Sequence, residues 1–146
     1  NKNMPVIGFH LTKISVERKD RITGQVNVKT NLKISDVKEE ERIAEVAKDM
    51  TSLRFDFEFK IDYEPKAANL LFVGHVLDVE KEEDAKKILK NWKNKKIDDE
   101  LRLRISNHVW LRCNIKALLL EEEIGLPIHL PLPRLVGGEK GTKGYT

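Results

Sequence analysis

A chain of 146 residues is long enough for one domain with a buried core and too short for two. Its formal net charge of +3 arises from 27 basic and 24 acidic residues that are interleaved, so charge alone does not indicate nucleic-acid binding. The single cysteine, Cys113, excludes an internal disulfide framework, and no apolar run reaches the about 20 residues that span a bilayer. With an N-terminus that lacks a signal-peptide core, these features predict a soluble, cytoplasmic protein. The abundance of Lys and Glu resembles the composition of proteins from thermophiles.

Two strands are predicted at the start of the chain. From residue 6 apolar and polar residues alternate as far as Leu11, and the phase then slips by one residue to Ile14. One extra residue near Lys13 is what a β-bulge inserts, so the pattern predicts a long, bent strand over residues 6–18. Residues 24–35 alternate in the same way and predict a second strand with a polar outer face.

Residues 36–50 follow a different pattern. Asp36 and Glu39 have the spacing of a helix N-cap and its reciprocal partner, and Ile43, Val46 and Met50 continue at helical spacing. We therefore expect a charged, helical insertion here. The alternative is a charged, mobile loop, because the run is highly polar.

The clearest strand spans residues 53–63, with the sequence Leu-Arg-Phe-Asp-Phe-Glu-Phe-Lys-Ile-Asp-Tyr. Every second residue is apolar and every residue between is charged, so one face is entirely apolar and the other entirely charged. This pattern predicts half of an antiparallel sheet with one solvated side. Pro65 cannot donate to a strand ladder and is expected to end the strand.

Residues 68–79 predict a fourth strand of another kind. Apolar residues occupy both phases of the alternation, with Leu70 and Phe72 in one and Val73 and Leu77 in the other. Such a strand is covered on both faces or lies at a subunit contact.

Two helices follow this strand. Over residues 82–95 apolar residues recur at i, i+3, i+4 and i+7, with acids at the first turn and lysines at the last. The apolar residues of a longer helix over residues 98–123 are too widely spread for one stripe, so we expect it to be buried on more than one side. Gly125 is expected to end it, and the prolines between 127 and 133 favour an extended segment.

The sequence thus predicts an α+β domain over residues 1–136, with a four-stranded antiparallel sheet and two C-terminal helices packed on one face, followed by a flexible, glycine-rich tail over residues 137–146. The five phenylalanines all lie in predicted strands. With two tryptophans they provide more apolar surface than one sheet and two helices need to bury. Such an excess commonly marks an oligomer contact or an exposed groove. The alternative is a monomer whose core takes up all of this surface.

No reaction centre is visible in the sequence. No glycine-rich loop lies between a strand and a helix, and the carboxylates alternate with lysines as on a solvated face. The four histidines are scattered without metal-ligand spacing, and there is one thiol, so we expect neither a metal site nor a cofactor. We expect no catalytic activity; the alternative is an enzyme with a small-molecule pocket lined by His75 or His108.

Residues 86–96 suggest another function. They hold six lysines and Trp92 with no acid, which suits a nucleic-acid-binding module that anchors the backbone through Lys90 and Lys93 and stacks a base on Trp92. The opposing interpretation is a solvated face, because acidic triplets flank the run. A third acidic triplet, residues 121–123, opposes the dipole at a helix C-terminus, so either the helix frays there or the cluster contacts a basic partner.

The order of elements over residues 5–135, with the run Gly-Leu-Pro-Ile-His-Leu-Pro from Gly125 to Pro131, resembles the SecB family of export chaperones. The resemblance implies a homodimer or homotetramer that binds unfolded polypeptides in apolar grooves between helix and sheet, without nucleotide hydrolysis. Residues 36–50 have no counterpart in that family, and the tail lacks its signature for docking the SecA motor. A general holdase or a chaperone associated with a toxin-antitoxin pair therefore fits equally well.

The resemblance also implies which residues form the site. Client binding is assigned to apolar residues of the sheet, the helices and the segment that follows them: Phe55, Phe57, Phe59, Trp92, Trp110, Leu118, Leu126 and Leu130. Oligomer contacts are assigned to strand residues: Phe9, Leu11, Val73 and Leu77. We expect unfolded protein clients as partners and neither membrane insertion nor nucleic-acid binding.

Overall fold

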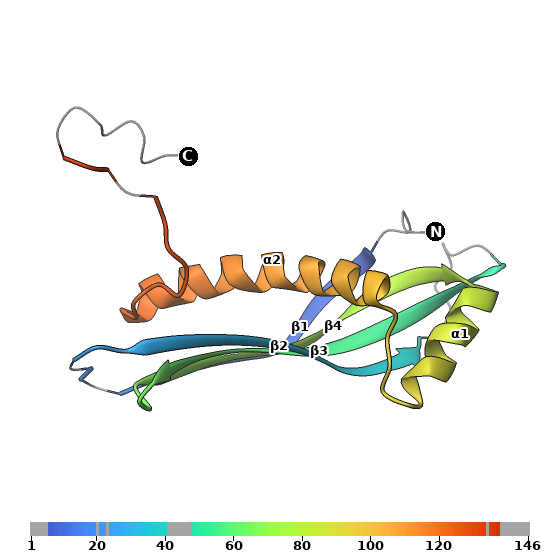
Figure 1. Ribbon diagram of the computed structural model, residues 1–146, viewed down its shortest axis with the longest axis horizontal. Helices are drawn as coiled ribbons and strands as arrows, with labels where there is room; N and C mark the ends of the chain where they lie inside the picture. The colour runs from blue at the N-terminus through green and yellow to red at the C-terminus, as the bar shows by residue number, and fades with distance from the viewer. Residues whose placement is uncertain (1–5, 20, 23, 41–47, 134, 138–146) are drawn as a thin grey trace.

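The computed structural model describes residues 6–19, 21–22, 24–40, 48–133 and 135–137. Four strands precede two helices: β1 (Val6–Arg18), β2 (Asn27–Glu39), β3 (Met50–Glu64), β4 (Ala68–Lys81), α1 (Glu82–Trp92) and α2 (Asp99–Ile124). Figure 1 shows α2 lying along one face of the sheet and α1 at one end of it. The predicted α+β architecture, four antiparallel strands followed by two helices that pack on the sheet, is confirmed.

The strands form one antiparallel sheet in the order β1-β4-β3-β2. β2, β3 and β4 are neighbours in the order of the sequence, whereas β1 pairs with β4 at the edge of the sheet opposite β2. The chain therefore crosses from one edge of the sheet to the other between β1 and β2. As a result β1 and β2 are the two edge strands, and β3 and β4 are central.

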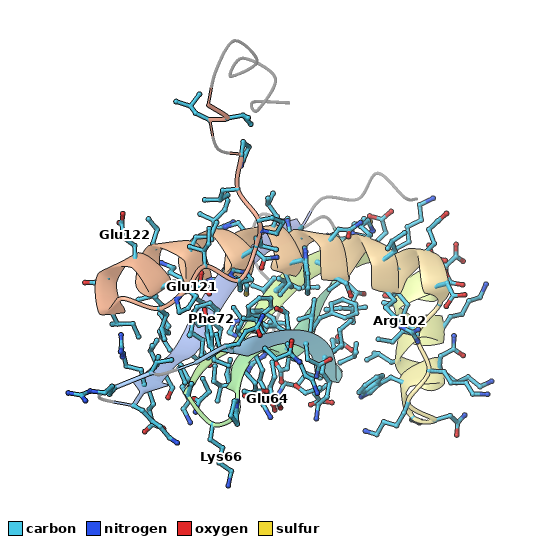
Figure 2. The ribbon with its side chains drawn as sticks, turned by 60° about the vertical axis from the view of Figure 1, so that its left-hand side comes forward. Glu64, Lys66, Phe72, Arg102, Glu121 and Glu122 are labelled. Carbon is cyan, nitrogen blue, oxygen red and sulfur yellow. The ribbon has the colours of Figure 1, made fainter. Side chains whose placement is uncertain are left out.

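β3 supplies the centre of the core. The apolar residues of its alternation, from Leu53 to Tyr63, are each 1% exposed or less, and the intervening charged residues lie on the opposite face. Phe59 stacks on Phe72 of β4 with 5.8 Å between ring centroids, and Figure 2 shows Phe72 between α2 and the sheet. Burying one such side chain stabilises the fold by about 1.5–3 kcal/mol. The prediction for residues 53–63 is confirmed.

β1 has the predicted bounds and the predicted bulge. Its register against β4 shifts between Leu11 and Lys13, so the slip in the apolar phase does mark an extra residue. Opposite Leu11, a Cβ on Gly74 would come within 2.2 Å of the backbone carbonyl oxygen of His10. Glycine at this position is what allows the two strands to approach so closely.

The helix predicted over residues 36–50 is wrong within the described residues. Asp36 and Glu39 belong to β2 instead of capping a helix, and residues 41–47 lie outside the described part of the chain. A register shift just before Asp36 turns Val37 toward the core, where it is 4% exposed. Pairing with the central strand β3 therefore outweighs the local capping signal.

Both helices follow their predicted ranges closely, although α1 ends at Trp92, before residue 95. Gly125 adopts a left-handed φ of 70° and ends α2 as predicted. Neither helix is long and apolar enough to cross a membrane, a finding that covers the described residues. Apart from Gly137, the tail predicted over residues 137–146 lies outside them.

Candidate functional site

α2 carries a second apolar face that is open to solvent. Leu103, Leu111, Ile115 and Leu119 are 62%, 61%, 53% and 60% exposed, and we call these four residues the α2 stripe. From Ile105 onward, every fourth residue of α2 is buried, as far as Glu121. Each residue of the stripe lies two positions before one of these buried residues. Two residues correspond to roughly 200° around a helix, so each side chain of the stripe points away from the buried side chain that follows it. Because a spacing of four residues advances roughly 40° around the helix, the stripe winds around α2 instead of following one straight line. The second covered side predicted for this helix is exposed in the single chain.

The stripe continues into a groove beside β1. The groove has a volume of about 420 Å³ and is lined by residues of β1 and α2: Phe9, Leu11, Ile14, Arg112, Ile115, Lys116 and Leu119. Ile115 and Leu119 belong to both the groove and the stripe, which makes the two continuous. Because β1 is an edge strand, the backbone N–H and C=O groups on its outer side are free of strand partners within the described sheet. Apolar side chains beside an open strand edge are features that bind extended polypeptide.

Aromatic rings join this surface to the core. Phe9 stacks on Phe57 with 5.6 Å between ring centroids, and the guanidinium carbon of Arg112 lies 4.5 Å from the centre of the Phe9 ring. On the other flank of α2, Trp110 meets the edge of Phe59 at 5.7 Å between centroids. The floor of the groove is therefore held by the core.

The structure separates the residues that were predicted to bind clients. Phe55, Phe57 and Phe59 are 1% exposed or less beneath α2, and Leu126 is 6% exposed, so these side chains are inaccessible in the folded chain. Trp110 is exposed, and three predicted residues are half-buried: Trp92, Leu118 and Leu130. Exposed apolar side chains lie on α2, along the groove and on the segment after α2, which includes Leu132 and Leu135. The aromatic face of β3 is not among them, because α2 covers that face.

The residues predicted to form oligomer contacts lie on two different faces. Phe9 and Leu11 line the groove, whereas Val73 and Leu77 lie on the sheet face opposite α2. There they form a half-buried apolar strip along β4 with Leu71 and Val79, beside a row of charged residues on β3. The apolar residues of β4 therefore divide between two faces of the sheet: one set is buried in the core under α2, and the other forms this strip.

A buried polar cluster, which the sequence did not predict, ties the segment after α2 to the core. Glu121 is 0% exposed; its carboxylate accepts a hydrogen bond from the Tyr63 hydroxyl and lies 2.8 Å from Nδ1 of His129. The other ring nitrogen of His129 contacts the side-chain oxygen of Asn114. Burial and the hydrogen bond to Glu121 raise the pKa of Tyr63 far above its ordinary value, so its hydroxyl stays protonated.

The acidic triplet 121–123 is thereby explained in part. α2 continues through it to Ile124, and Figure 2 shows Glu121 directed toward the sheet and Glu122 directed away. Glu121 contacts the imidazole ring of His129, which lies in the segment after α2 of the same chain. A sequence signal existed, because extending the buried spacing of four residues from Ala117 reaches Glu121.

A second buried cluster joins α2 to β4. The Arg104 guanidinium donates to both carboxylate oxygens of Asp78 at 2.9 and 3.1 Å and to Glu80 at 2.8 Å. Asp78 is 0% exposed and Glu80 is 5% exposed. Burial, followed by the neighbouring Asp78 carboxylate, raises the pKa of Glu80 to about 8 in spite of Arg104. These three hydrogen bonds join α2 to β4, which suits an anchor for the helix.

This raised pKa predicts a pH dependence of stability. Because the pKa of Glu80 is about 8 in the folded protein and near its ordinary value of 4.5 when unfolded, the folded state binds this proton more tightly. Its contribution to the free energy of unfolding is complete below about pH 4.5 and is lost as the pH rises to about 8. Urea unfolding across this range should show the loss in the wild type and not in Glu80→Gln, with the exposed Glu122→Gln as a control. Parallel profiles for wild type and Glu80→Gln would contradict the prediction.

The basic run does not present a free stacking platform. The indole N–H of Trp92 donates to Asp36 at 3.1 Å, and Nζ of Lys95 lies 4.7 Å from the centre of the indole ring. A nucleic-acid base would have to displace Lys95 to stack on that face.

No protein-family model and no curated protein matches this chain. Within the described ranges, no group of three or more His, Cys, Asp and Glu side chains is placed to hold a metal ion. The chemistry of the α2 stripe and the groove is therefore the main indication of function.

Proposed function

We propose that this protein is an oligomeric, SecB-like chaperone that holds nonnative polypeptides on the α2 stripe and in the adjoining groove, without nucleotide hydrolysis. The observation that carries the proposal is the exposed stripe running into an apolar groove beside the open edge of β1. The order of four antiparallel strands and two helices supports the likeness to SecB. Exposed apolar surfaces of this kind mark interaction sites in proteins.

Binding would combine two sources of affinity that tolerate many sequences. An extended client segment pairs its backbone with the outer edge of β1 and directs alternate side chains toward Ile115 and Leu119. Each Å² of apolar surface buried contributes roughly 25 cal/mol. The register shifts of β1 near Ile7 and Thr12 interrupt its edge, so short client segments pair while long sheet-like association is disfavoured.

The apolar strip on β4, centred on Val73 and Leu77, lies on the opposite face of the sheet and is assigned to contacts between subunits. This arrangement leaves the α2 stripe available to clients. Multi-angle light scattering measures the molar mass directly, and a monomer at working concentration would refute the oligomeric part of the proposal.

Charge placed on the stripe is expected to abolish chaperone activity. In Leu111→Glu combined with Ile115→Glu, at least about tenfold more protein should be needed to halve the aggregation of a chemically denatured client, because a loss of about 1.4 kcal/mol in binding is a tenfold effect. Light scattering of the client, diluted from denaturant with stoichiometric protein, measures this amount.

Asn31→Glu combined with Lys33→Glu is the matched control, since it also adds acids at exposed positions, but on the charged face of β2. This control should suppress aggregation like the wild type. Both variants must keep the wild-type circular dichroism spectrum. Equal activity of the stripe variant and the wild type, or a wild type that leaves client aggregation unchanged, would refute the proposal.

A further inference from the structure

Two histidines from distant parts of the chain lie side by side on the sheet face opposite α2. His10 of β1 and His75 of β4 are direct partners in the antiparallel register. Their ring centroids are 5.1 Å apart, with 34° between the ring planes. His10 is exposed and His75 is half-buried, so the pair is accessible from solvent.

The separation of the rings fits a single metal ion held between them. A histidine nitrogen binds zinc at about 2.0–2.1 Å, which places the ring centre about 3.2 Å from the ion. Two such rings at a tetrahedral angle have centres about 5.2 Å apart. The distance in this pair, 5.1 Å, agrees with that value.

The backbone makes room for this arrangement. A Cβ on Gly8 would come within 3.2 Å of Cε1 of His10 and 3.4 Å of the Leu77 side chain. Glycine at position 8 therefore lets the His10 ring lie along its own strand. The position of the His10 ring therefore depends on the glycine at position 8 as well as on the pairing of β1 with β4.

The electrostatic surroundings favour neutral imidazole, the form that binds metals. Burial lowers the pKa of His75, and Arg54 and His10 lower it further, while Asp56 and Glu40 act in the opposite direction. Asp56 is the register partner of His75 on β3 and pairs with Arg54 at 2.7 Å, which balances the charge of that arginine. Nδ1 of His75 is shielded from solvent and has no hydrogen-bond partner within the described residues, so no neighbour there holds it in one protonation state.

We propose that His10 and His75 form a binding site for a divalent transition-metal ion, with water completing the coordination sphere. Two imidazole ligands suit copper, nickel and zinc, and the usual order of affinities places copper(II) first. The site has fewer than the three protein ligands of a catalytic zinc centre, so its affinity is modest. This inference does not rest on client binding, because the pair lies on the other face of the sheet from the α2 stripe. His75 lies between Val73 and Leu77 on β4, so a bound ion would lie within the strip assigned to subunit contacts.

Isothermal titration of the untagged full chain with copper(II) and zinc(II) chlorides tests the site. We expect one ion per chain, with copper(II) bound more tightly than zinc(II). His10→Gln and His75→Gln should each weaken binding by at least about tenfold. His108→Gln, whose ring lies near Phe9 on the α2 side of the sheet, should bind like the wild type. Lowering the pH to about 5.5 should weaken binding, because protonated imidazole cannot coordinate a metal.

A measurement on the wild type keeps the proposal testable if a variant fails to fold. Addition of zinc(II) should shift or broaden the imidazole NMR signals of His10 and His75 and leave those of His108 in place. Binding that survives in both His10→Gln and His75→Gln, an equal loss in His108→Gln, or the absence of heat and of imidazole shifts in the wild type would each overturn the proposal.

Discussion

Replacing Glu121 by alanine is expected to lower the free energy of unfolding by about 2–6 kcal/mol, because it removes the acceptor that two buried polar groups share. The carboxylate is the shared acceptor for Tyr63 and His129 in a region without solvent access. Its loss leaves two polar groups buried without their main partner, at a cost of about 1–3 kcal/mol each. Urea unfolding at neutral pH should show a lower midpoint with an unchanged slope.

Glu122→Ala is the matched control for this variant. Glu122 is the next residue of the same helix, but it is exposed and directed away from the sheet, so its change should stay within about 0.5 kcal/mol. Glu121→Gln keeps an acceptor without the charge and should fall between the two. Similar losses for the alanine variants at 121 and 122 would show that the buried cluster does not anchor the chain.

Replacing Arg104 by methionine is expected to have an effect of similar size, about 3–5 kcal/mol. Arg104 makes three hydrogen bonds to Asp78 and Glu80, and both carboxylates are almost completely buried. Methionine fills much of the space but leaves the buried Asp78 carboxylate without its cation, beside Glu80, which largely keeps its proton at neutral pH because its pKa is about 8. The urea midpoint at neutral pH measures the loss.

Arg102→Met is the matched control. It shows how much stability is lost when an arginine of α2 outside the buried cluster is replaced by methionine. Arg102 is exposed; its contact with Asp99 spans 3.7 Å at the surface, and it donates a hydrogen bond of 3.3 Å to the Ile97 carbonyl. About 1–2 kcal/mol or less should therefore be lost. Arg104→Lys keeps the charge without the bidentate fork and should be intermediate. Equal losses at 102 and 104 would rule out a special role for the buried cluster.

The two clusters together explain how α2 can present an apolar outer face. Arg104 ties the first turns of the helix to β4, and Glu121 ties its last turn to β3 through Tyr63. Between these anchors, Val109, Cys113 and Ala117 pack on the sheet. The α2 stripe is therefore displayed on a helix that is held at both ends, which would preorganise the surface for the client binding that we propose.

Much of the fold was predictable because its signals are local. Strict alternation over residues 53–63 specifies a half-buried strand wherever it pairs, and the phase slip near Lys13 specifies a bulge in β1. The same local logic failed at Asp36, where a capping pattern was present but β2 continued along β3. Local propensity decides only when no neighbouring strand offers better burial.

The candidate site was predictable only in outline. The sequence indicated an excess of apolar surface, but it did not indicate that α2 would cover Phe55 and Phe59 and leave Leu111 and Ile115 outside. The phenylalanines of β3 and the exposed residues of α2 are equally apolar in the sequence. Which of them are buried depends on which face of α2 packs on the sheet, and packing over the whole length of the helix sets that face.

Apart from the end of β2, where a helix was expected over residues 36–50, the amino-acid sequence by itself determined the described elements and their order, and the apolar and charged faces of β3. Side-chain periodicity follows directly from backbone geometry. Only the tertiary structure decided which residues meet: Glu121 with His129, Arg104 with Asp78, and His10 with His75. Strand order and register bring together positions that are remote in the chain, and no local pattern encodes those pairings.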